Sequence, residues 1–415
     1  MRLPSVEGAL EARTRLSSVV LETPFQILER WSQRLKASIY IKREDLQQVR
    51  SFKIRGAYNK IVKLTEAERK QEIVCASAGN HAQGFAFSCR DLQIKGTVFM
   101  PLPTPQQKIE QVRMFGGDFV EVRLVGDTYD DSQKAARKFQ KESQSHFIHP
   151  FDDLDVIEGQ ATLALEVLEQ AQQPLDYLFV PVGGGGLISG VLTIFKERSP
   201  NTKIIGVEPA GAPSMFQSLE NNKITPLKKI DKFVDGAAVK KVGQLSFEVC
   251  RAHLDDCVLV EEGRICQEIL DLYNKEGIVA EPAGALALSA LDQYAKGVEG
   301  KQVGVLICGG NNDITRTPEI KERALLFAQL KHYFIVRFPQ RAGALKEFVN
   351  TILGPHDDIT FFEYSQKTSR VNAPAVVGIR LKSASDFEPL VARMKKGDFY
   401  GEYLNDKPDL YQFLV

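Results

Sequence analysis

The chain has 415 residues, and its 53 basic residues balance its 53 acidic residues, so the formal net charge is zero. Because such a protein has no large electrostatic field, we exclude nucleic acid and an anionic membrane surface as its main partners. No apolar run reaches the roughly 18 residues that a membrane-spanning helix needs, and the N-terminus lacks the apolar core of a signal peptide. We therefore expect a cytoplasmic protein.

At roughly 100 to 200 residues a domain, the length predicts two to four domains. Apolar segments rich in β-branched and aromatic residues alternate with helical segments over most of the chain. Segments 158–171 and 264–277 show the apolar spacing of helices. Continuous apolar strands that alternate with helices indicate an α/β fold whose parallel sheets are covered on both faces. The predicted strands are 38–44, 72–77, 96–101, 118–125, 176–182, 203–209, 257–262 and 303–310.

The last part of the chain follows a different pattern, which predicts an α+β unit. Its elements come in the order βαββαβ, which is typical of the ferredoxin-like fold. The charged segment 317–330 is predicted to be a connecting helix. The predicted strands are 332–339, 359–366, 375–382 and 411–415, and the predicted helices are 342–353 and 385–396.

A run of glycines, "VPVGGGGLISG" at 180–190, follows an apolar strand and precedes a helical pattern. Without side chains, Gly183, Gly184, Gly185 and Gly186 let backbone N–H groups converge on an anion, and the helix that starts at Leu187 adds its partial positive charge. The segment predicts a phosphate site. It is neither a P-loop nor a dinucleotide fingerprint, because the Lys-Ser/Thr pair and the GxGxxG spacing are missing. The alternative is a flexible hinge.

A second turn, "SAGNHAQG" at 77–84, lies between a predicted strand and a predicted helix. Ser77, Gly79, Asn80 and His81 place small and polar groups where backbone and hydroxyl donors suit a carboxylate, and the amide of Asn80 suits a ring hydroxyl. The alternative is an ordinary helix cap made by Ser77 or Asn80. A lone histidine such as His81 is more often structural than catalytic.

Two further segments remain ambiguous when each is taken alone. In "RSFKIRG" (50–56), Lys53 is either a nucleophile or part of a solvated basic turn. In "ICGGNND" (307–313), Cys308 ends a predicted strand, where ligands of open α/β sheets usually lie, or is simply a core residue before a turn. None of the six cysteines forms a CxxC pair, and no histidine has zinc-finger spacing, so we expect no metal site.

Four segments together resemble a known family: "SFKIRGA" (51–57), "SAGNHAQG" (77–84), "VGGGGL" (182–187) and "CGGNN" (308–312). In this order they are similar to the pyridoxal-phosphate enzymes of the tryptophan-synthase β-type fold (fold type II), and more narrowly to threonine dehydratases. The resemblance implies a catalytic domain over 1–325, with a smaller subdomain at about 54–150. The segment 331–415 resembles the ACT-like regulatory domain of the biosynthetic enzymes.

The resemblance also implies roles for the residues of these segments. Lys53 matches the lysine that holds pyridoxal 5'-phosphate covalently and then acts as the base at the substrate Cα. Asn80 would hold the ring hydroxyl, and Cys308 would face the pyridine nitrogen. The cofactor phosphate would bind at Gly183, Gly184, Gly185, Gly186 and Leu187, and the substrate carboxylate at Ser77, Gly79, Asn80 and His81.

The activity that the resemblance implies is deamination of L-threonine, and also L-serine, to a 2-oxo acid and ammonia, the first step of isoleucine biosynthesis. It implies inhibition by isoleucine, a counter-effect of valine, and a homotetramer. The family turn commonly has Pro-Gly where this chain has Ala342-Gly343, so individual effector ligands do not follow.

Two alternatives stay open at this point. The first is another enzyme of the same fold, a serine dehydratase or a serine racemase; the appended regulatory segment favours the biosynthetic threonine enzyme. The second is a non-catalytic amino-acid sensor, which would have lost the lysine or the phosphate loop, whereas Lys53 and the glycine run are both present.

Overall fold

The structure is a computed structural model, and it describes residues 2–364 and 372–407. The chain divides into two compact units, Met1–Asp313 and Ile314–Val415. No helix among the described residues is long and apolar enough to cross a bilayer.

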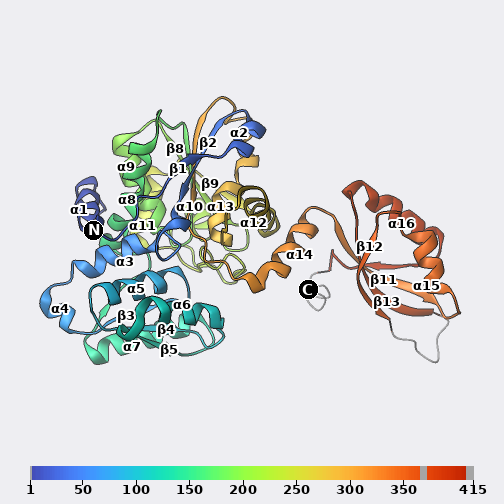
Figure 1. Ribbon diagram of the computed structural model, residues 1–415, viewed down its shortest axis with the longest axis horizontal. Helices are drawn as coiled ribbons and strands as arrows, with labels where there is room; N and C mark the ends of the chain where they lie inside the picture. The colour runs from blue at the N-terminus through green and yellow to red at the C-terminus, as the bar shows by residue number, and fades with distance from the viewer. Residues whose placement is uncertain (1, 365–371, 408–415) are drawn as a thin grey trace. The chain divides into compact units, whose positions relative to one another are not determined.

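The larger sheet of the first unit has six strands in the order β1-β2-β10-β7-β8-β9 (Figure 1). All neighbours pair in parallel except the short edge strand β1, which is antiparallel to β2. The carboxyl ends of β2, β10 and β7 therefore lie at the same edge of the sheet, where ligands of α/β proteins usually bind. The strands are β1 (Phe25–Ile27), β2 (Ser38–Arg43), β7 (Tyr177–Pro181), β8 (Lys203–Pro209), β9 (Asp256–Val260) and β10 (Gln302–Ile307).

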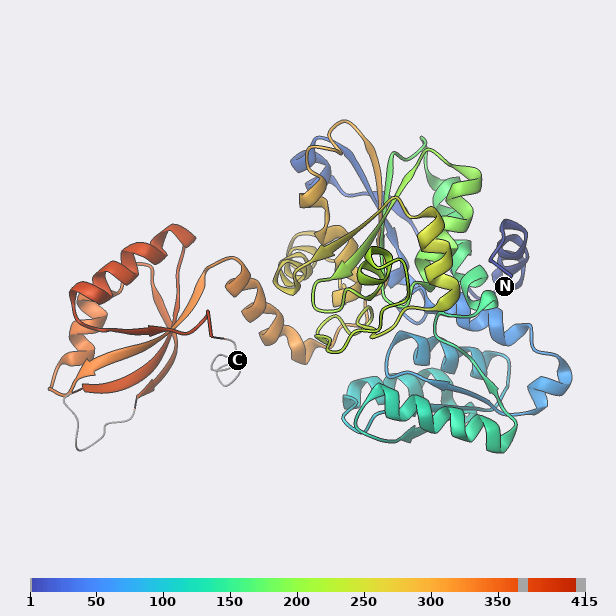
Figure 2. The same cartoon turned by 180° about the vertical axis from the view of Figure 1, so that it is seen from behind.

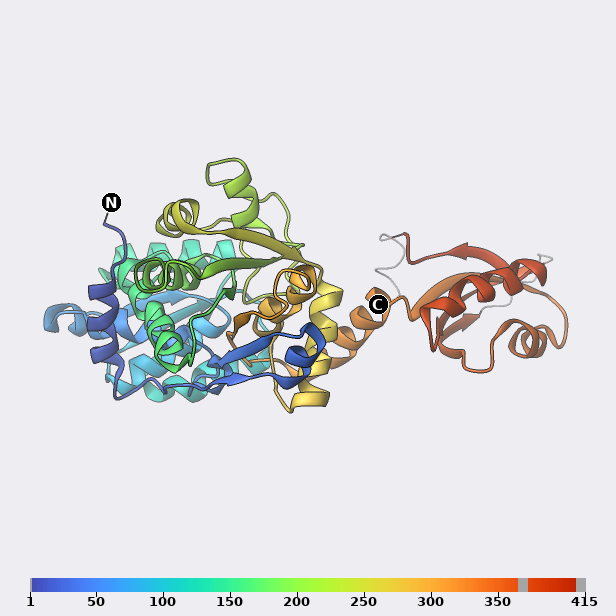
Figure 3. The same ribbon diagram turned by 90° about the horizontal axis from the view of Figure 1, so that it is seen from above.

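Helices cover both faces of this sheet (Figures 1 and 2). On one side α8 packs against α9, and the N-terminal helix α1 packs on α8 (Figure 3); on the other side α13 packs on β10, β7 and β8 and is covered by α12. These helices are α1 (Val6–Leu16), α2 (Glu29–Leu35), α8 (Leu154–Gln170), α9 (Gly186–Arg198), α10 (Ser214–Glu220), α11 (Gln244–His253), α12 (Glu262–Glu276) and α13 (Pro282–Ser289).

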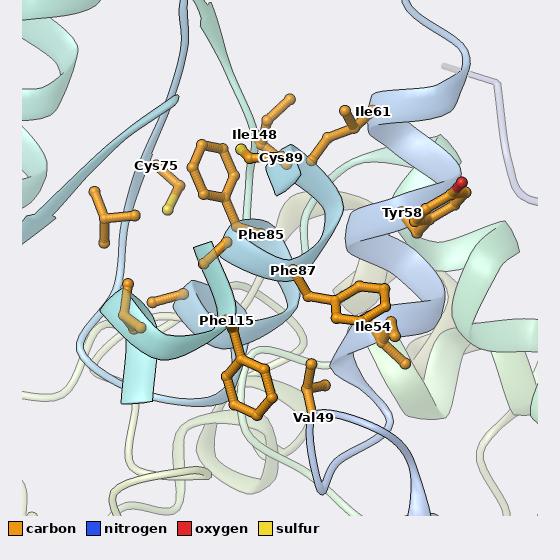
Figure 4. Close-up of a cluster of buried hydrophobic side chains, with 14 of the residues drawn as sticks. Val49, Ile54, Tyr58, Ile61, Cys75, Phe85, Phe87, Cys89, Phe115 and Ile148 are labelled. Carbon is orange, nitrogen blue, oxygen red and sulfur yellow. The ribbon is translucent and has the colours of Figure 1, made fainter. Parts of the chain in front are cut away.

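The smaller sheet is parallel, with the strand order β5-β4-β3-β6. Apolar side chains of α3, α5 and α6, among them Ile54 and Phe85, share a buried cluster with one face of this sheet (Figure 4), and α7 packs on the other face through Ala136. These elements are α3 (Lys53–Val62), α4 (Glu66–Lys70), β3 (Ile73–Ala76), α5 (Asn80–Asp91), β4 (Gly96–Met100), α6 (Gln106–Gly116), β5 (Val120–Leu124), α7 (Tyr129–Ser143) and β6 (His146–Phe147).

Local sequence signals explain where several of these helices begin and end. The side chain of Asp153 accepts hydrogen bonds from the first amides of α8, and Thr128 with Asp131 forms a capping box at the start of α7. Gly277 ends α12 with φ +66°, a backbone conformation that a residue with a side chain rarely adopts.

The second unit begins with α14 (Thr317–Phe327), followed by an antiparallel sheet with the order β12-β13-β11-β14. Its core joins Phe334, Val377 and Phe399 of the sheet side to Phe348 and Leu390 of the helices. The elements are β11 (Lys331–Pro339), α15 (Ala344–Glu347), a π-helical turn (Phe348–Ile352), β12 (Asp358–Tyr364), β13 (Asn372–Arg380), α16 (Phe387–Lys396) and β14 (Tyr400–Tyr403).

The fold class expected from the sequence is confirmed: parallel sheets covered by helices, followed by a βαββαβ unit. The predicted strand 203–209 coincides with β8, and the boundaries of the other predicted strands that the structure describes differ by at most three residues. The predicted strand 411–415 lies outside the described residues, and the strand that pairs with the free side of β11 is β14, at 400–403. The single helix expected over 342–353 is a four-residue α-helix followed by a π-helical turn.

Candidate active site

The segments that contain Lys53 and Cys308 are joined directly. Ser51 and Gly309 form an antiparallel bridge, in which the Phe52 amide donates to the carbonyl of Cys308 at 3.1 Å. This bridge continues the edge of the large sheet beyond the end of β10 and places the first turn of α3 beside it. Two segments about 255 residues apart in the chain thus form one surface.

Lys53 is the first residue of α3 and is half-buried. Its Nζ donates a hydrogen bond to the carbonyl of Pro150 at 2.8 Å. Burial lowers the pKa of the Lys53 amine to about 8, although the nearby Cys308 and Glu281 groups act in the opposite direction. The amine is therefore much easier to deprotonate than an ordinary lysine.

The backbone around Lys53 is held by close packing from α5. A Cβ atom on Gly84 would lie 3.2 Å from the carbonyl oxygen of Lys53 and from the amide nitrogen of Ile54. Only a residue without a side chain lets α5 approach α3 this closely without a shift of the backbone. Gly84 belongs to the segment 77–84, so this contact joins the second predicted motif to the first.

A buried network of charges fixes the other side of α3. The guanidinium of Arg55 donates to both oxygens of Glu44, at 2.8 Å, and to Glu166, at 2.6 and 2.9 Å. The Nζ of Lys42 donates to Glu166 at 2.6 Å. Burial disfavours the charged form of Glu44, but Arg55 holds the pKa of this carboxyl below its ordinary value. The paired charges orient the helix that begins with Lys53.

The glycine loop after β7 is packed too closely for side chains. A Cβ atom on Gly184 would lie 2.3 Å from the ring of Phe151, and one on Gly183 would lie 2.9 Å from the backbone of Ala237. Gly185 has φ +90°, in the left-handed region that glycine favours. The loop therefore needs glycine for both contact and conformation.

This loop ends in the N-terminus of α9, at Gly186. The first amides of a helix, here including Gly186 and Leu187, have no acceptor inside the helix and carry its partial positive charge. The hydroxyl of Ser246 lies against Gly185 and is buried without a hydrogen-bond partner. Free amides and an unpartnered hydroxyl suit a bound anion.

Asn80 is the first residue of α5, and its side chain forms hydrogen bonds with Glu281 and Asn311, which belong to two other segments of the chain. Its Nδ2 donates to Glu281 Oε1 at 2.6 Å, and its Oδ1 accepts from Asn311 Nδ2 at 2.8 Å. Ser77 Oγ accepts from the amide of Gly79. Apart from chain neighbours, no atom of the described residues lies within 4 Å of the position of a Cβ atom on Gly79, so the start of α5 faces open space.

The side chain of His81 points away from this open space. Its Nε2 lies 3.1 Å from the carbonyl of Ile148, and only 3% of the residue is exposed. Burial, together with the charge of Lys53, lowers the pKa of His81 to about 3, so the ring is neutral. What His81 presents at the start of the helix is its backbone amide.

Cys308 lies just beyond β10 and is buried, with 3% of the residue exposed. Its thiol donates to the carbonyl of Ala283 at 3.3 Å. Burial and the nearby Glu281 carboxyl raise the pKa of this thiol well above its ordinary value. Cys308 is therefore an uncharged group on the same surface as Lys53.

Sequence reasoning missed three residues of this site: Glu281, Phe151 and Ser246. Glu281 is a buried carboxyl, 5% exposed, and the signal that could have found it is a lone acid inside the apolar run "IVAEPAGALAL" (278–288). Phe151 and Ser246 have no such signal, because only the fold brings them to the glycine loop.

Comparisons with known proteins agree with this geometry. Residues 16–309 match the family described as pyridoxal-phosphate dependent enzyme, and residues 322–414 match the C-terminal regulatory domain of threonine dehydratase.

Curated relatives resemble the whole chain. The chain is 52% identical over 413 residues to the L-threonine dehydratase biosynthetic IlvA of Bacillus subtilis, covering 100% of this chain and 98% of the relative. The relative of the same name from Halalkalibacterium halodurans is 50% identical over 410 residues, covering 99% of each chain.

Solved structures resemble most of the chain. The processed form of threonine deaminase isoform 2 from Solanum lycopersicum superposes with a TM-score of 0.73 at 38% identity, over 78% of this chain and 91% of that one. Maize serine racemase superposes with a TM-score of 0.72 at 29% identity, over 79% and 99%. The chain therefore belongs to the family of pyridoxal-phosphate dependent enzymes, and within it to the biosynthetic threonine dehydratases.

Proposed function

We propose that this protein deaminates L-threonine to 2-oxobutanoate and ammonia, the first step of isoleucine biosynthesis, and that it also accepts L-serine. Water is lost across Cα and Cβ, and the resulting enamine takes up water to release ammonia. The single observation that best supports this proposal is that Lys53, an amine with a lowered pKa, lies beside Cys308 and donates to Pro150, whose neighbour Phe151 packs on the glycine loop. The names of the relatives point to the same substrate.

The residues of the site fit the family's cofactor. The glycine loop has close contacts that exclude side chains, free helix amides and the unpartnered Ser246 hydroxyl, which together suit the phosphate. We assign the phosphate to the backbone at 183–187, the covalent bond to Lys53, the ring oxygen to Asn80 and the ring nitrogen to Cys308. When bound, pyridoxal phosphate withdraws electrons from the substrate and makes its Cα–H acidic.

Lys53 has two tasks in this proposal, and both need a neutral amine. With a pKa of about 8, roughly half of the amines are neutral near pH 8, against roughly one in 300 for an ordinary lysine. The neutral Nζ would hold the cofactor, and in its free form it would take up the proton from the substrate Cα. The hydrogen bond to Pro150 fixes the direction of the side chain.

The start of α5 is assigned to the substrate carboxylate. Ser77, Gly79 and Asn80 lie next to the open space at Gly79, and amides at a helix N-terminus favour an anion. His81 takes part through its backbone amide, because its ring is turned to Ile148. Cys308 has no charge with which to keep the ring nitrogen protonated, which disfavours long-lived carbanions and favours prompt elimination.

The C-terminal unit is assigned to feedback control. We propose that isoleucine binds it and inhibits the enzyme, and that valine counters this effect. Gly343 has φ +85° directly before α15, in the Ala342-Gly343 turn where the family commonly has Pro-Gly. A dimerisation module without a ligand is the alternative.

Three further features belong to this proposal. The six cysteines are buried, as small apolar residues of the interior are, and we place the enzyme in the reducing environment of the cytoplasm. We propose a homotetramer, because closed symmetric oligomers are common among such enzymes. We also propose the catalytic domain over 1–325, with a smaller subdomain at about 54–150, and the regulatory domain over 331–415.

A 2-oxo acid assay tests the proposed activity. The purified protein, supplied with pyridoxal phosphate, is expected to form 2-oxobutanoate from L-threonine, and Lys53→Ala to form none. Failure of the native protein with L-threonine, together with formation of D-serine from L-serine, would identify a racemase instead. A colourless, inert protein would leave the sensor as the explanation.

The same assay with isoleucine tests the regulation. A chain that ends at Leu330 is expected to keep its activity and to lose its response to isoleucine, because it lacks the sheet of the second unit. Inhibition that persists in the shortened chain would show that the effector binds elsewhere.

A further inference from the structure

Glu281 is a buried acid that the proposed mechanism does not use. It precedes α13, and its backbone amide donates to the carbonyl of Gly309 at 3.2 Å. Its side chain makes no capping hydrogen bond to that helix. Instead it fills the space beside Gly309, where a Cβ atom would lie 2.5 Å from Glu281 Oε1. The carboxyl therefore points into the site and does not serve the helix that it precedes.

This carboxyl determines how the amide of Asn80 is oriented. Asn80 Nδ2 donates to Glu281 Oε1 at 2.6 Å, and Asn80 Oδ1 accepts from Asn311 Nδ2 at 2.8 Å. Asn311 Nδ2 also donates to the carbonyl of Val49 at 2.9 Å. A carboxylate can only accept, so Asn80 must turn its nitrogen towards Glu281. Among the described residues, this nitrogen has Glu281 as its only acceptor, so one of its two hydrogens remains free.

Burial of this acid is unfavourable, and its hydrogen bonds offset the cost only in part. Among the described residues, no lysine or arginine forms an ion pair with Glu281, and an unpaired buried carboxylate is unfavourable. Burial and, to a smaller extent, the charge of Asp235 raise the pKa of Glu281 to about 7. Hydrogen bonds from the Asn80 side chain and the Asn311 backbone amide, and the charge of Lys108, act against this rise. Its protonation therefore changes near neutral pH.

The charge of Glu281 also acts on the reactive groups. It raises the pKa of the Lys53 amine and of the Cys308 thiol. A change in the protonation of Glu281 would therefore alter both the orientation of Asn80 and the electrostatic potential at Lys53.

We propose that Glu281 is a positioning residue whose carboxylate orients Asn80, so that one N–H of the amide stays free for the ring oxygen of the cofactor. This inference rests on the proposed role of Asn80. When Glu281 is protonated, one of its oxygens becomes a donor and the other accepts only as a neutral group, so the hydrogen bond from Asn80 weakens and the orientation of the amide is no longer fixed. The binding and the absorption of the cofactor should then depend on pH near neutrality.

Glu281→Gln tests this proposal, because it keeps the shape of the side chain and removes the charge. Glu158→Gln is the matched control: Glu158 is also buried, 2% exposed, and its pKa is also raised by burial, but it lies against Gly8 of α1. The measurements are the melting temperature, the dissociation constant of pyridoxal phosphate, and the pH dependence of the absorption of the bound cofactor.

We expect Glu281→Gln to fold, to lose the change in absorption near neutral pH, and to bind the cofactor about tenfold more weakly, as when a charge-assisted hydrogen bond becomes neutral. Glu281→Asp should retain part of the pH dependence, and Glu158→Gln all of it. If Glu281→Gln does not fold, the absorption of the cofactor bound to the native protein is measured as a function of pH. An absorption band that does not change between about pH 6 and pH 8 overturns the proposal.

The outcome is distinguishable from failure of the proposed function. The native protein could be coloured and deaminate threonine while Glu281→Gln shows the same pH dependence of the absorption and the same affinity for pyridoxal phosphate. In that case only the role of Glu281 is refuted. Equal effects of Glu158→Gln would also refute it, because they would show a general response to the loss of a buried charge. If the native protein binds no cofactor, the proposed function fails first and this inference fails with it.

Discussion

Replacement of Gly184 by alanine tests whether the glycine loop needs its close contact with Phe151. The new Cβ atom would lie 2.3, 2.4 and 2.5 Å from three ring carbons, whereas carbon atoms in contact are ordinarily about 3.5 to 4.0 Å apart. The ring must therefore move by roughly 1 Å or more. Phe151 follows Pro150, whose carbonyl accepts from Lys53, so the shift reaches both the phosphate loop and the reactive amine.

Overpacking of this kind costs about 1–3 kcal/mol. We expect the free energy of unfolding to fall by that amount and the affinity for pyridoxal phosphate to fall about tenfold to a hundredfold, since each tenfold is about 1.4 kcal/mol. Denaturant unfolding without cofactor measures the first quantity, and titration followed by absorbance measures the second.

Gly297→Ala is the control, because its Cβ atom would have its nearest neighbours at 3.5 and 3.9 Å. Phe151→Ala in the Gly184→Ala background should restore part of the affinity, because the two residues are in contact and their effects are therefore coupled. If Gly184→Ala binds the cofactor as tightly as Gly297→Ala does, the close contact has no role in binding and the reasoning is wrong.

Three further predictions concern Lys53, Cys308 and Arg55. The rate at which the cofactor-free protein takes up pyridoxal phosphate should rise with pH and level off above about 8, as the amine loses its proton; stopped-flow absorbance measures it, and a rate independent of pH contradicts the lowered pKa. Cys308→Asp should increase the side transamination, measured as pyridoxamine phosphate formed per 2-oxo acid; an unchanged ratio would refute the role of the uncharged thiol. Arg55→Ala should lower the free energy of unfolding by about 3–5 kcal/mol, because it leaves the carboxylate of Glu44 buried without its ion-pair partner and leaves Glu166 paired with Lys42 alone; denaturant unfolding with a loss below about 1 kcal/mol would show that the network contributes little.

Much of the fold could be predicted from local patterns, because strands such as β4 and β8 are continuous apolar runs between helical segments. The edge strands β1 and β6 were not predicted, since they have only three and two residues and depend on the neighbour with which they pair. The π-helical turn after α15 was also missed, because its residues show the same apolar spacing as a regular helix.

The candidate site, like the fold, could be predicted only in part from local patterns. Gly184 and Lys53 belong to motifs that contain several informative residues each, so the sequence could indicate them. Glu281 is separated from Asn80 by 201 positions, and Phe151 meets Gly184 only because the segment before α8 passes under the glycine loop. Such partners are set by tertiary packing, which a local pattern does not contain.

The attachment site of the cofactor tests the central assignment most directly. Borohydride reduction of the protein loaded with pyridoxal phosphate, followed by digestion and mass spectrometry, would show which lysine holds the cofactor. The account predicts one modified peptide, with the modification on Lys53. Modification of a different lysine, or none in a protein that is active with threonine, would contradict it.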